Sequence, residues 1–356
     1  MFVFLSKCFN FNHLAILGLL FSSITIGAVH DPRALEADPF TATTAIAPAL
    51  GNLGDHQFIV TTKVAASQEF VNQGYRLTLG FNHSEALRAF KEAVRLDPNN
   101  AMAYWGWALV LGPNLNLPMQ ANVQQQAYMA MTKAVALKDK VSDREKAYID
   151  ALAVRYSADN NTSRDELDAA YANAMAKLVK TYPDDLDAAT LYAAAIMNTN
   201  PWDYWYRDGS PKKHTEVILS TLQSVLKRNP NHAGANHYLI HTVEAFRPEL
   251  GVAAADRLGS LMPGAGHLVH MPSHIYVAVG MWDEVVNCNI ASWNASVKRM
   301  EEKGLGDEAR SFHAMHWLVY GHLQKGAFEK AAALVEEMNG YIKAESDKRT
   351  RSYHPW

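Results

Sequence analysis

The sequence predicts an all-α protein built from repeated helix pairs, and three observations point to this fold class. From about residue 60 onward the chain is rich in Ala, Leu, Met, Glu and Lys and has no alternating runs of Val, Ile and Thr. Asp-Pro, Asn-Pro and Met-Pro dipeptides interrupt it, as expected where helices end. Two of these prolines, Pro230 and Pro263, lie 33 residues apart, which indicates a repeat of about that length.

The N-terminus has the order of features found in a secretory signal. Lys7 precedes an apolar run over residues 14–26, and the segment closes on the small residue Ala28. We therefore expect a signal peptide over residues 1–28 and a secreted or periplasmic protein, with an uncleaved membrane anchor as the alternative. Residues 29–56 have neither helical nor strand periodicity, which predicts a linker or N-terminal arm.

Residues 57–345 fit a helical repeat of the tetratricopeptide type, in which two antiparallel helices form a unit of about 34 residues. The clearest unit has residues of the expected kind at its packing positions, namely Phe70, Gly74, Ala86, Phe90, Ala93 and Pro98. Counting such units predicts about five to six helix pairs in one α-solenoid, whose first helices line a concave surface. Residues 346–356 are expected to form a C-terminal tail.

Charge and cysteine content exclude several classes of function. The 33 Lys and Arg residues are balanced by 36 Asp and Glu residues, so no basic surface for nucleic acids is expected. Cys288 is the one cysteine beyond the leader, so the mature chain has no internal disulfide. No glycine-rich phosphate loop is present, and no nucleotide cofactor is expected. A membrane would be contacted only through an uncleaved leader.

Histidines gather in the C-terminal half, where nine of the fifteen lie between His232 and His322. In the repeat register, three successive first helices turn eight side chains toward the concave surface: His237, His241, Glu244, His267, His270, His274, His313 and His316. Histidines three, four or seven residues apart share a helical face and can ligate one ion. Pro272 is expected to kink its helix and to turn His270 and His274 toward a common point.

Neutral imidazoles favour transition metals over Mg or Ca, so Zn, Cu or Fe is the cofactor expected here, and this number of histidines would suit two ions. Glu244 is the candidate catalytic residue, because a carboxylate could ligate, bridge, or act as a base toward metal-bound water. His83, His232 and His322 are weaker candidates. An anionic or peptide-binding groove and a structural hydrogen-bonded network are the alternative interpretations of the same histidines.

Several long blocks of the sequence resemble a family of bacterial tetratricopeptide-repeat proteins over about residues 56–335. The blocks are QGYRLTLGFNHSEALRAF, LDPNNAMAYWGWALVLGPNLNLPM, NPNHAGANHYLIHTVEA and GHLVHMPSHIY. The resemblance implies a helical-repeat fold that is usually exported. It includes the family's His-rich blocks, which match at His83, His237, His241, His267, His270 and His274. It implies no particular reaction.

We therefore expect an exported repeat protein that acts as a binding scaffold, with a His-lined, metal-binding pocket on its concave surface. Its partner would be a protein, a peptide or a small molecule held in that groove. The alternative is a metal-dependent enzyme, either an oxidoreductase or a hydrolase, that uses the histidine cluster. The sequence by itself does not decide whether the protein is an enzyme.

Overall fold

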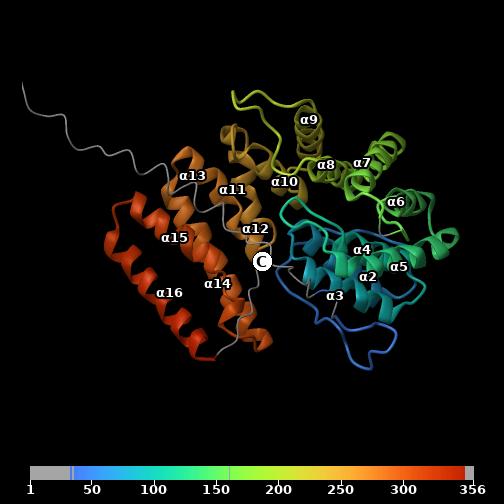
Figure 1. Cartoon of the computed structure of the whole chain (residues 1–356), viewed down its shortest axis with the longest axis horizontal. Helices are drawn as coiled ribbons and strands as arrows, with labels where there is room; N and C mark the ends of the chain where they lie inside the picture. Colours follow the sequence, from blue (N-terminus) through green and yellow to red (C-terminus); the bar gives the residue numbers. More distant parts are fainter. Residues whose placement is uncertain (1–32, 34–35, 160, 349–356) are drawn as a thin grey trace, which may run out of the picture.

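The computed structural model describes residues 33, 36–159 and 161–348, and Figure 1 shows its helices following one another as antiparallel pairs. In chain order the pairs are α2 (Ala65–Leu79) with α3 (His83–Leu96), α4 (Ala101–Leu111) with α5 (Ala121–Leu137), α6 (Asp143–Ala153) with α7 (Arg164–Thr181), α8 (Leu186–Thr199) with α9 (Lys213–Arg228), α10 (Ala233–Val243) with α11 (Val252–Leu261), the broken helix α12 (Gly266–His270) and α13 (Pro272–Val279) with α14 (Trp282–Lys303), and α15 (Phe312–Gln324) with α16 (Phe328–Lys348). Short 3-10 turns lie at Lys138–Lys140, Pro248–Leu250 and Asp307–Ala309.

This is an all-α solenoid of the predicted tetratricopeptide-like kind. The described residues contain isolated β-bridges but no strand. They form seven helix pairs, one more than the upper number expected. The pair of α6 with α7 has no proline before its first helix, whose start is marked by a capping box between Ser142 and Glu145.

Prolines mark the starts of several first helices in a regular way. Pro98 and Pro183 each stand two residues before an N-cap. Asn100 caps α4 by accepting from the amide of residue 103 at 3.1 Å, and Asp185 caps α8 by accepting from that of residue 188 at 3.0 Å. Because a proline cannot continue the preceding helix and the next side chains cap the following one, the turn between units is set locally.

The first helices of successive pairs contact one another and form the inner face of the solenoid, as seen for α2 with α4, α4 with α6, α8 with α10, and α10 with α13. The superhelix is tight enough for α10 to contact α2 as well. Farther along, Arg299 and Lys303 of α14 form ion pairs with Glu85 of α3, the first at 2.8 Å. The C-terminal half is thereby brought against the beginning of the solenoid, which places α10 and α12 beside the end of α2.

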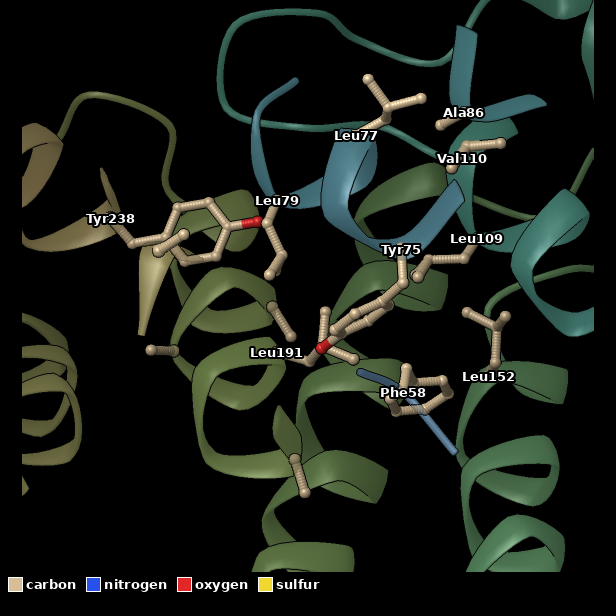
Figure 2. Close-up of a cluster of buried hydrophobic side chains, with 14 of the residues drawn as sticks. Phe58, Tyr75, Leu77, Leu79, Ala86, Leu109, Val110, Leu152, Leu191 and Tyr238 are labelled. Atoms are coloured by element: carbon tan, nitrogen blue, oxygen red, sulfur yellow. The ribbon is translucent and has the colours of Figure 1, made fainter. Parts of the chain in front are cut away.

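The N-terminal arm contributes to the core rather than lying free. Figure 2 shows Phe58 beside Tyr75 of α2, and their ring centroids are 4.3 Å apart. Farther back along the arm, the amide of Gly264 donates to the carbonyl oxygen of Asn52 at 2.8 Å. The chain's own residues 52–61 therefore cover part of the inner surface on which we expected a partner to bind.

Buried hydrophobic side chains form one continuous cluster that extends from Leu53 to Val285. Cys288 is a free cysteine, and burial raises the pKa of its thiol to about 12. No helix of the described segments is both long enough and apolar enough to cross a bilayer. The signal peptide expected over residues 1–28, and most of the tail expected after residue 345, lie outside the described residues.

The packing around Phe90 yields a test of the repeat geometry. A Cβ added to Gly74 would lie 2.9 Å from the Phe90 ring, and one added to Gly106 would overlap that ring. We therefore expect Gly106→Ala to lower the free energy of unfolding by about 1–3 kcal/mol through overpacking. Gly259 of α11 has nothing within 4 Å of its would-be Cβ, so Gly259→Ala should be neutral or stabilising by up to about 1 kcal/mol.

Urea unfolding of the two variants, monitored by circular dichroism, checks this expectation. Equal free energies of unfolding of the Gly106→Ala and Gly259→Ala proteins would show that the packing of Phe90 does not require a glycine at position 106.

Candidate metal centre

Six histidines meet on the inner face of the solenoid as two groups of three. One group is His237 and His241 of α10 with His267 of α12, and the other is His270 and His274 with His313 of α15. We call these the first and second triads. Within each triad the nitrogens that could ligate an ion all lie within 4.8 Å of one another. The structure thus brings together six of the seven histidines expected to bind metal.

The break between α12 and α13 divides the histidines of this segment between the triads. Helix α12 ends at His270 and α13 starts at Pro272, which lacks the amide proton needed to continue the helix. His270 and His274 consequently face each other, with 3.1 Å between their Nε2 atoms. His267 instead joins the first triad, where its Nε2 lies 3.2 Å from Nε2 of His237. Spacing alone suggested that His267, His270 and His274 could ligate one ion. The structure instead divides them between the two triads.

Backbone and amide oxygens orient two of the rings through Nδ1. Nδ1 of His237 lies 2.8 Å from the carbonyl oxygen of Leu79, the last residue of α2, where helix carbonyls lack an intrahelical partner. Nδ1 of His270 lies 2.6 Å from Oδ1 of Asn289, whose Nδ2 donates to the carbonyl oxygen of Val285. Both acceptors require a proton on Nδ1, so Nε2 of each neutral ring carries a lone pair.

Glu244 orients one ring in each triad. Its Oε1 accepts from Nδ1 of His241 at 2.9 Å, and its Oε2 accepts from Nδ1 of His274. Burial would raise the pKa of this carboxyl, but His274 and His241 outweigh that effect and hold the pKa well below its usual range. The candidate catalytic residue thus stands behind the ligands, where a carboxylate fixes the tautomer and raises the basicity of the ring nitrogens.

The inward-facing nitrogens are arranged as metal ligands would be. With Nδ1 of both rings donating, the Nε2 lone pairs of His270 and His274 point at one another across 3.1 Å, which is repulsive without a cation between them. A tetrahedral ion with bonds of about 2.0–2.1 Å would hold its nitrogens about 3.3 Å apart. Nε2 of His241 is buried and has no hydrogen-bond partner among the described residues. Leaving such an atom unsatisfied costs about 1–3 kcal/mol.

Burial favours the neutral form of several of these rings. Burial lowers the pKa of His237 well below its usual value, and the nearby His241 lowers it further. Burial likewise lowers the pKa values of His267 and His270. For His313, burial together with His274 and His316 lowers the pKa to about 4. Neutral imidazole is the form that binds a metal, so these four rings are favoured in the required state in the apo-protein.

Aromatic side chains pack against both triads. The Phe81 ring centroid lies 4.5 Å from that of His237, Trp202 meets His241 edge-on at 5.3 Å, and Trp317 packs on His274 at 4.7 Å. Phe81 and Trp202 have φ angles of 55° and 64°, a left-handed conformation that large side chains rarely adopt. Such strain costs about 1–3 kcal/mol per residue and is concentrated at functional sites.

His316, which was also expected to bind metal, does not join either triad. Its side chain is exposed on α15, although it follows His313 by one helical turn. Trp317 occupies the position on that helix that faces His270 and His274. His322, at the last turn of α15, also lies outside the triads.

A third group, His56 with Asp187 and His232, was not foreseen as a unit, because His56 lies in the N-terminal arm. Nδ1 of His232 accepts from the amide of Ala235 and so caps α10, which leaves the proton on Nε2 of the neutral ring. That Nε2 lies 3.3 Å from a carboxylate oxygen of Asp187, and Nε2 of His56 lies 2.9 Å from the same oxygen. This tautomer fits a clasp in which both rings contact Asp187 and hold the arm, not a set of metal ligands.

Comparisons with known proteins assign no family to this chain. No family model matches the chain, and no curated protein matches it. Among solved structures, the TPR domain of P58(IPK) is similar to this chain at 13% sequence identity and a TM-score of 0.21, over 76% of this chain and 99% of that one. At this TM-score the likeness carries no argument, and the fold rests on the helix pairs described above.

Burial of these rings predicts how the stability of the apo-protein depends on pH. Unfolded His313 has a pKa of about 6.5, whereas the folded protein lowers it to about 4. Between these values the unfolded chain binds a proton that the folded chain does not, so stability is present above pH 6.5 and is lost as the pH falls. This ring accounts for a loss of at most about 1.4 kcal/mol per pH unit.

Urea unfolding of the metal-free protein between pH 7 and pH 5 measures that loss, with His313→Gln as the matched variant. The variant should lose stability less steeply than the parent chain. Parallel losses in the two proteins would mean that the His313 ring is not held neutral.

Proposed function

We propose that this protein is a helical-repeat metal-binding protein whose two histidine triads each hold one transition-metal ion. The observation that supports this most directly is the pair of facing Nε2 lone pairs on His270 and His274, both of whose Nδ1 atoms already donate. A cation between these nitrogens removes the repulsion. A proton on one ring would do the same, and measurement of bound metal separates the two possibilities.

The donor set restricts the kind of ion. Six imidazoles and no carboxylate face the two positions, since both oxygens of Glu244 are directed to ring Nδ1 atoms. Imidazole suits Zn, Cu, Fe and Ni, whereas Mg and Ca prefer oxygen ligands. Three ligands per ion also leave a coordination position open, which is the arrangement of reactive rather than purely structural sites.

The proposed role is that of an exported binding scaffold that contains this metal centre. Repeat solenoids offer extended surfaces for protein or peptide partners, and the leader expected over residues 1–28 would direct export. N-terminal sequencing of the protein recovered from the exported fraction tests that part separately from metal binding.

Removal of one ring from each triad tests the centre itself. The double variant His241→Ala/His274→Ala should lose the bound metal, because each position keeps only two nitrogens. Elemental analysis after reconstitution with Zn²⁺ or with Cu⁺ gives the moles of metal per chain. The matched control is His316→Ala, which removes an exposed histidine of α15 and should bind as much metal as the parent. A double variant that retains full metal content, with unchanged helicity, would exclude the site.

The role of Glu244 behind the ligands leads to a second expectation. In Glu244→Gln, one oxygen can still accept from a ring nitrogen, but the amide group that replaces the other oxygen cannot, so only one of the two rings stays oriented. We expect metal affinity to fall by about 10–100-fold. Competition with a chelator measures the change. An affinity equal to that of the parent protein would show that the carboxylate does not orient the ligands.

A further inference from the structure

A small cavity on the inner face of the solenoid lies apart from the ligand nitrogens of both triads. Its volume is about 30 Å³, and α2, α4, α8 and α10 all contribute side chains to its wall. The six triad histidines are not among its lining residues. Since one water needs about 10–15 Å³ measured in this way, the cavity has room for one molecule of about three or four non-hydrogen atoms.

Two buried hydroxyl groups in this wall have no protein partner. Tyr171 of α7 and Tyr238 of α10 line the cavity and are 2% and 3% exposed. Neither hydroxyl forms a hydrogen bond with any residue that the structure describes. Burial raises the pKa of both phenols, so the two hydroxyls stay protonated and can donate. Because buried polar groups are nearly always hydrogen-bonded, these donors require an acceptor inside the cavity.

Positive charge is in excess along the same wall. Arg155, which is 2% exposed, donates from Nε to Asp168 at 2.8 Å and from Nη2 to the carbonyl oxygen of Pro113 at 3.0 Å. Nε of Arg164 donates to the same carboxylate at 3.0 Å, so two guanidinium groups share one Asp. The guanidinium carbon of Arg155 lies 4.7 Å from the ring centroid of Tyr171. An uncompensated buried charge is unfavourable, so an anion is the favoured occupant.

The loop between α4 and α5 is fixed as part of the wall by its own hydrogen bonds. Oδ1 of Asn114 accepts from two amides of the loop, at 2.8 and 3.0 Å. The carbonyl oxygen of Pro113 accepts from Nδ2 of Asn198 at 3.2 Å, in addition to its bond from Arg155. These bonds leave little of the wall to be ordered when a ligand enters, which favours the binding of a small molecule.

We propose that this cavity is a binding site for a small carboxylate anion, such as formate or acetate. The carboxylate oxygens accept from the hydroxyls of Tyr171 and Tyr238, and their charge pairs with Arg155. The hydrogen or methyl end of the ligand lies against Leu191 and Ala195, which also line the cavity. This site is separate from the metal centre and does not depend on bound metal.

Titration of the metal-free full chain with isotope-labelled acetate, at constant ionic strength, tests the proposal through the broadening of the acetate NMR signal. Metal-free protein ensures that acetate bound to an ion in a triad is not counted. We expect one saturable site per chain with a dissociation constant no lower than about 40 μM, because the binding energy per non-hydrogen atom has a ceiling. Acetamide, which has the same shape without the charge, should bind at least about tenfold more weakly.

Variants that remove one hydroxyl each locate the bound anion. Tyr171→Phe and Tyr238→Phe keep the packed rings, and each should weaken acetate binding by about tenfold or more, since each removes one hydrogen bond to a charged group. The matched control is Tyr75→Phe, which removes a buried, unpartnered hydroxyl that lies outside the cavity and should bind acetate as the parent does. Circular dichroism of every variant verifies that the helices form.

The outcomes separate this site from the metal centre. A parent chain that shows no saturable binding of acetate or formate would overturn the proposal. Equal affinities for acetate and acetamide would show that charge does not select the ligand, and unchanged affinity in both cavity variants would place the ligand elsewhere. Either result would also overturn it. Because every titration uses metal-free protein, none of these results bears on the proposed metal binding.

Discussion

The bridge from Glu244 to two histidines is the interaction on which the rest of the centre depends. It joins His241 on α10 to His274 on α13, and so links the inner helices of two successive repeat units. A mostly buried carboxylate is unfavourable unless its oxygens are satisfied, and here each oxygen accepts from a ring nitrogen. The same bonds put the protons on Nδ1 and turn the Nε2 atoms inward. One side chain therefore sets both the distance between the units and the chemistry of the rings.

The tight curvature of the solenoid supplies what a single repeat could not. Contact of α10 with α2 brings the carbonyl of Leu79 to His237 and Phe81 to the face of the first triad. Ion pairs from α14 to Glu85 of α3 hold the ends of this curve together. A straighter stack of the same helices would leave these rings facing water. Curvature thus converts a row of histidines into an enclosed centre with a low local dielectric, where electrostatic interactions are stronger.

Stability elsewhere in the molecule balances the strain at this site. Phe81 and Trp202 occupy left-handed backbone conformations while covering ligand rings. Around them lies a continuous hydrophobic cluster, to which the arm contributes Phe58. The contact of His56 with Asp187 holds the arm in place. The arm fills part of the inner face, so a peptide bound there would share that face with residues 52–61. The enclosed geometry instead suits ions and molecules of a few atoms.

The sequence by itself determined the fold class, the repeat and the position of the histidines on inner helices, because helix propensity, proline punctuation and side-chain spacing are local properties. It also placed the kink at Pro272 correctly. The division of six rings into two triads, the exposure of His316, the orienting role of Glu244 and the clasp of His56 were decided only by tertiary structure. Each depends on how far the superhelix turns between units and on which segments, distant in sequence, it brings together. Small rotations summed over successive helix pairs set that curvature, and no local pattern in the sequence reports it.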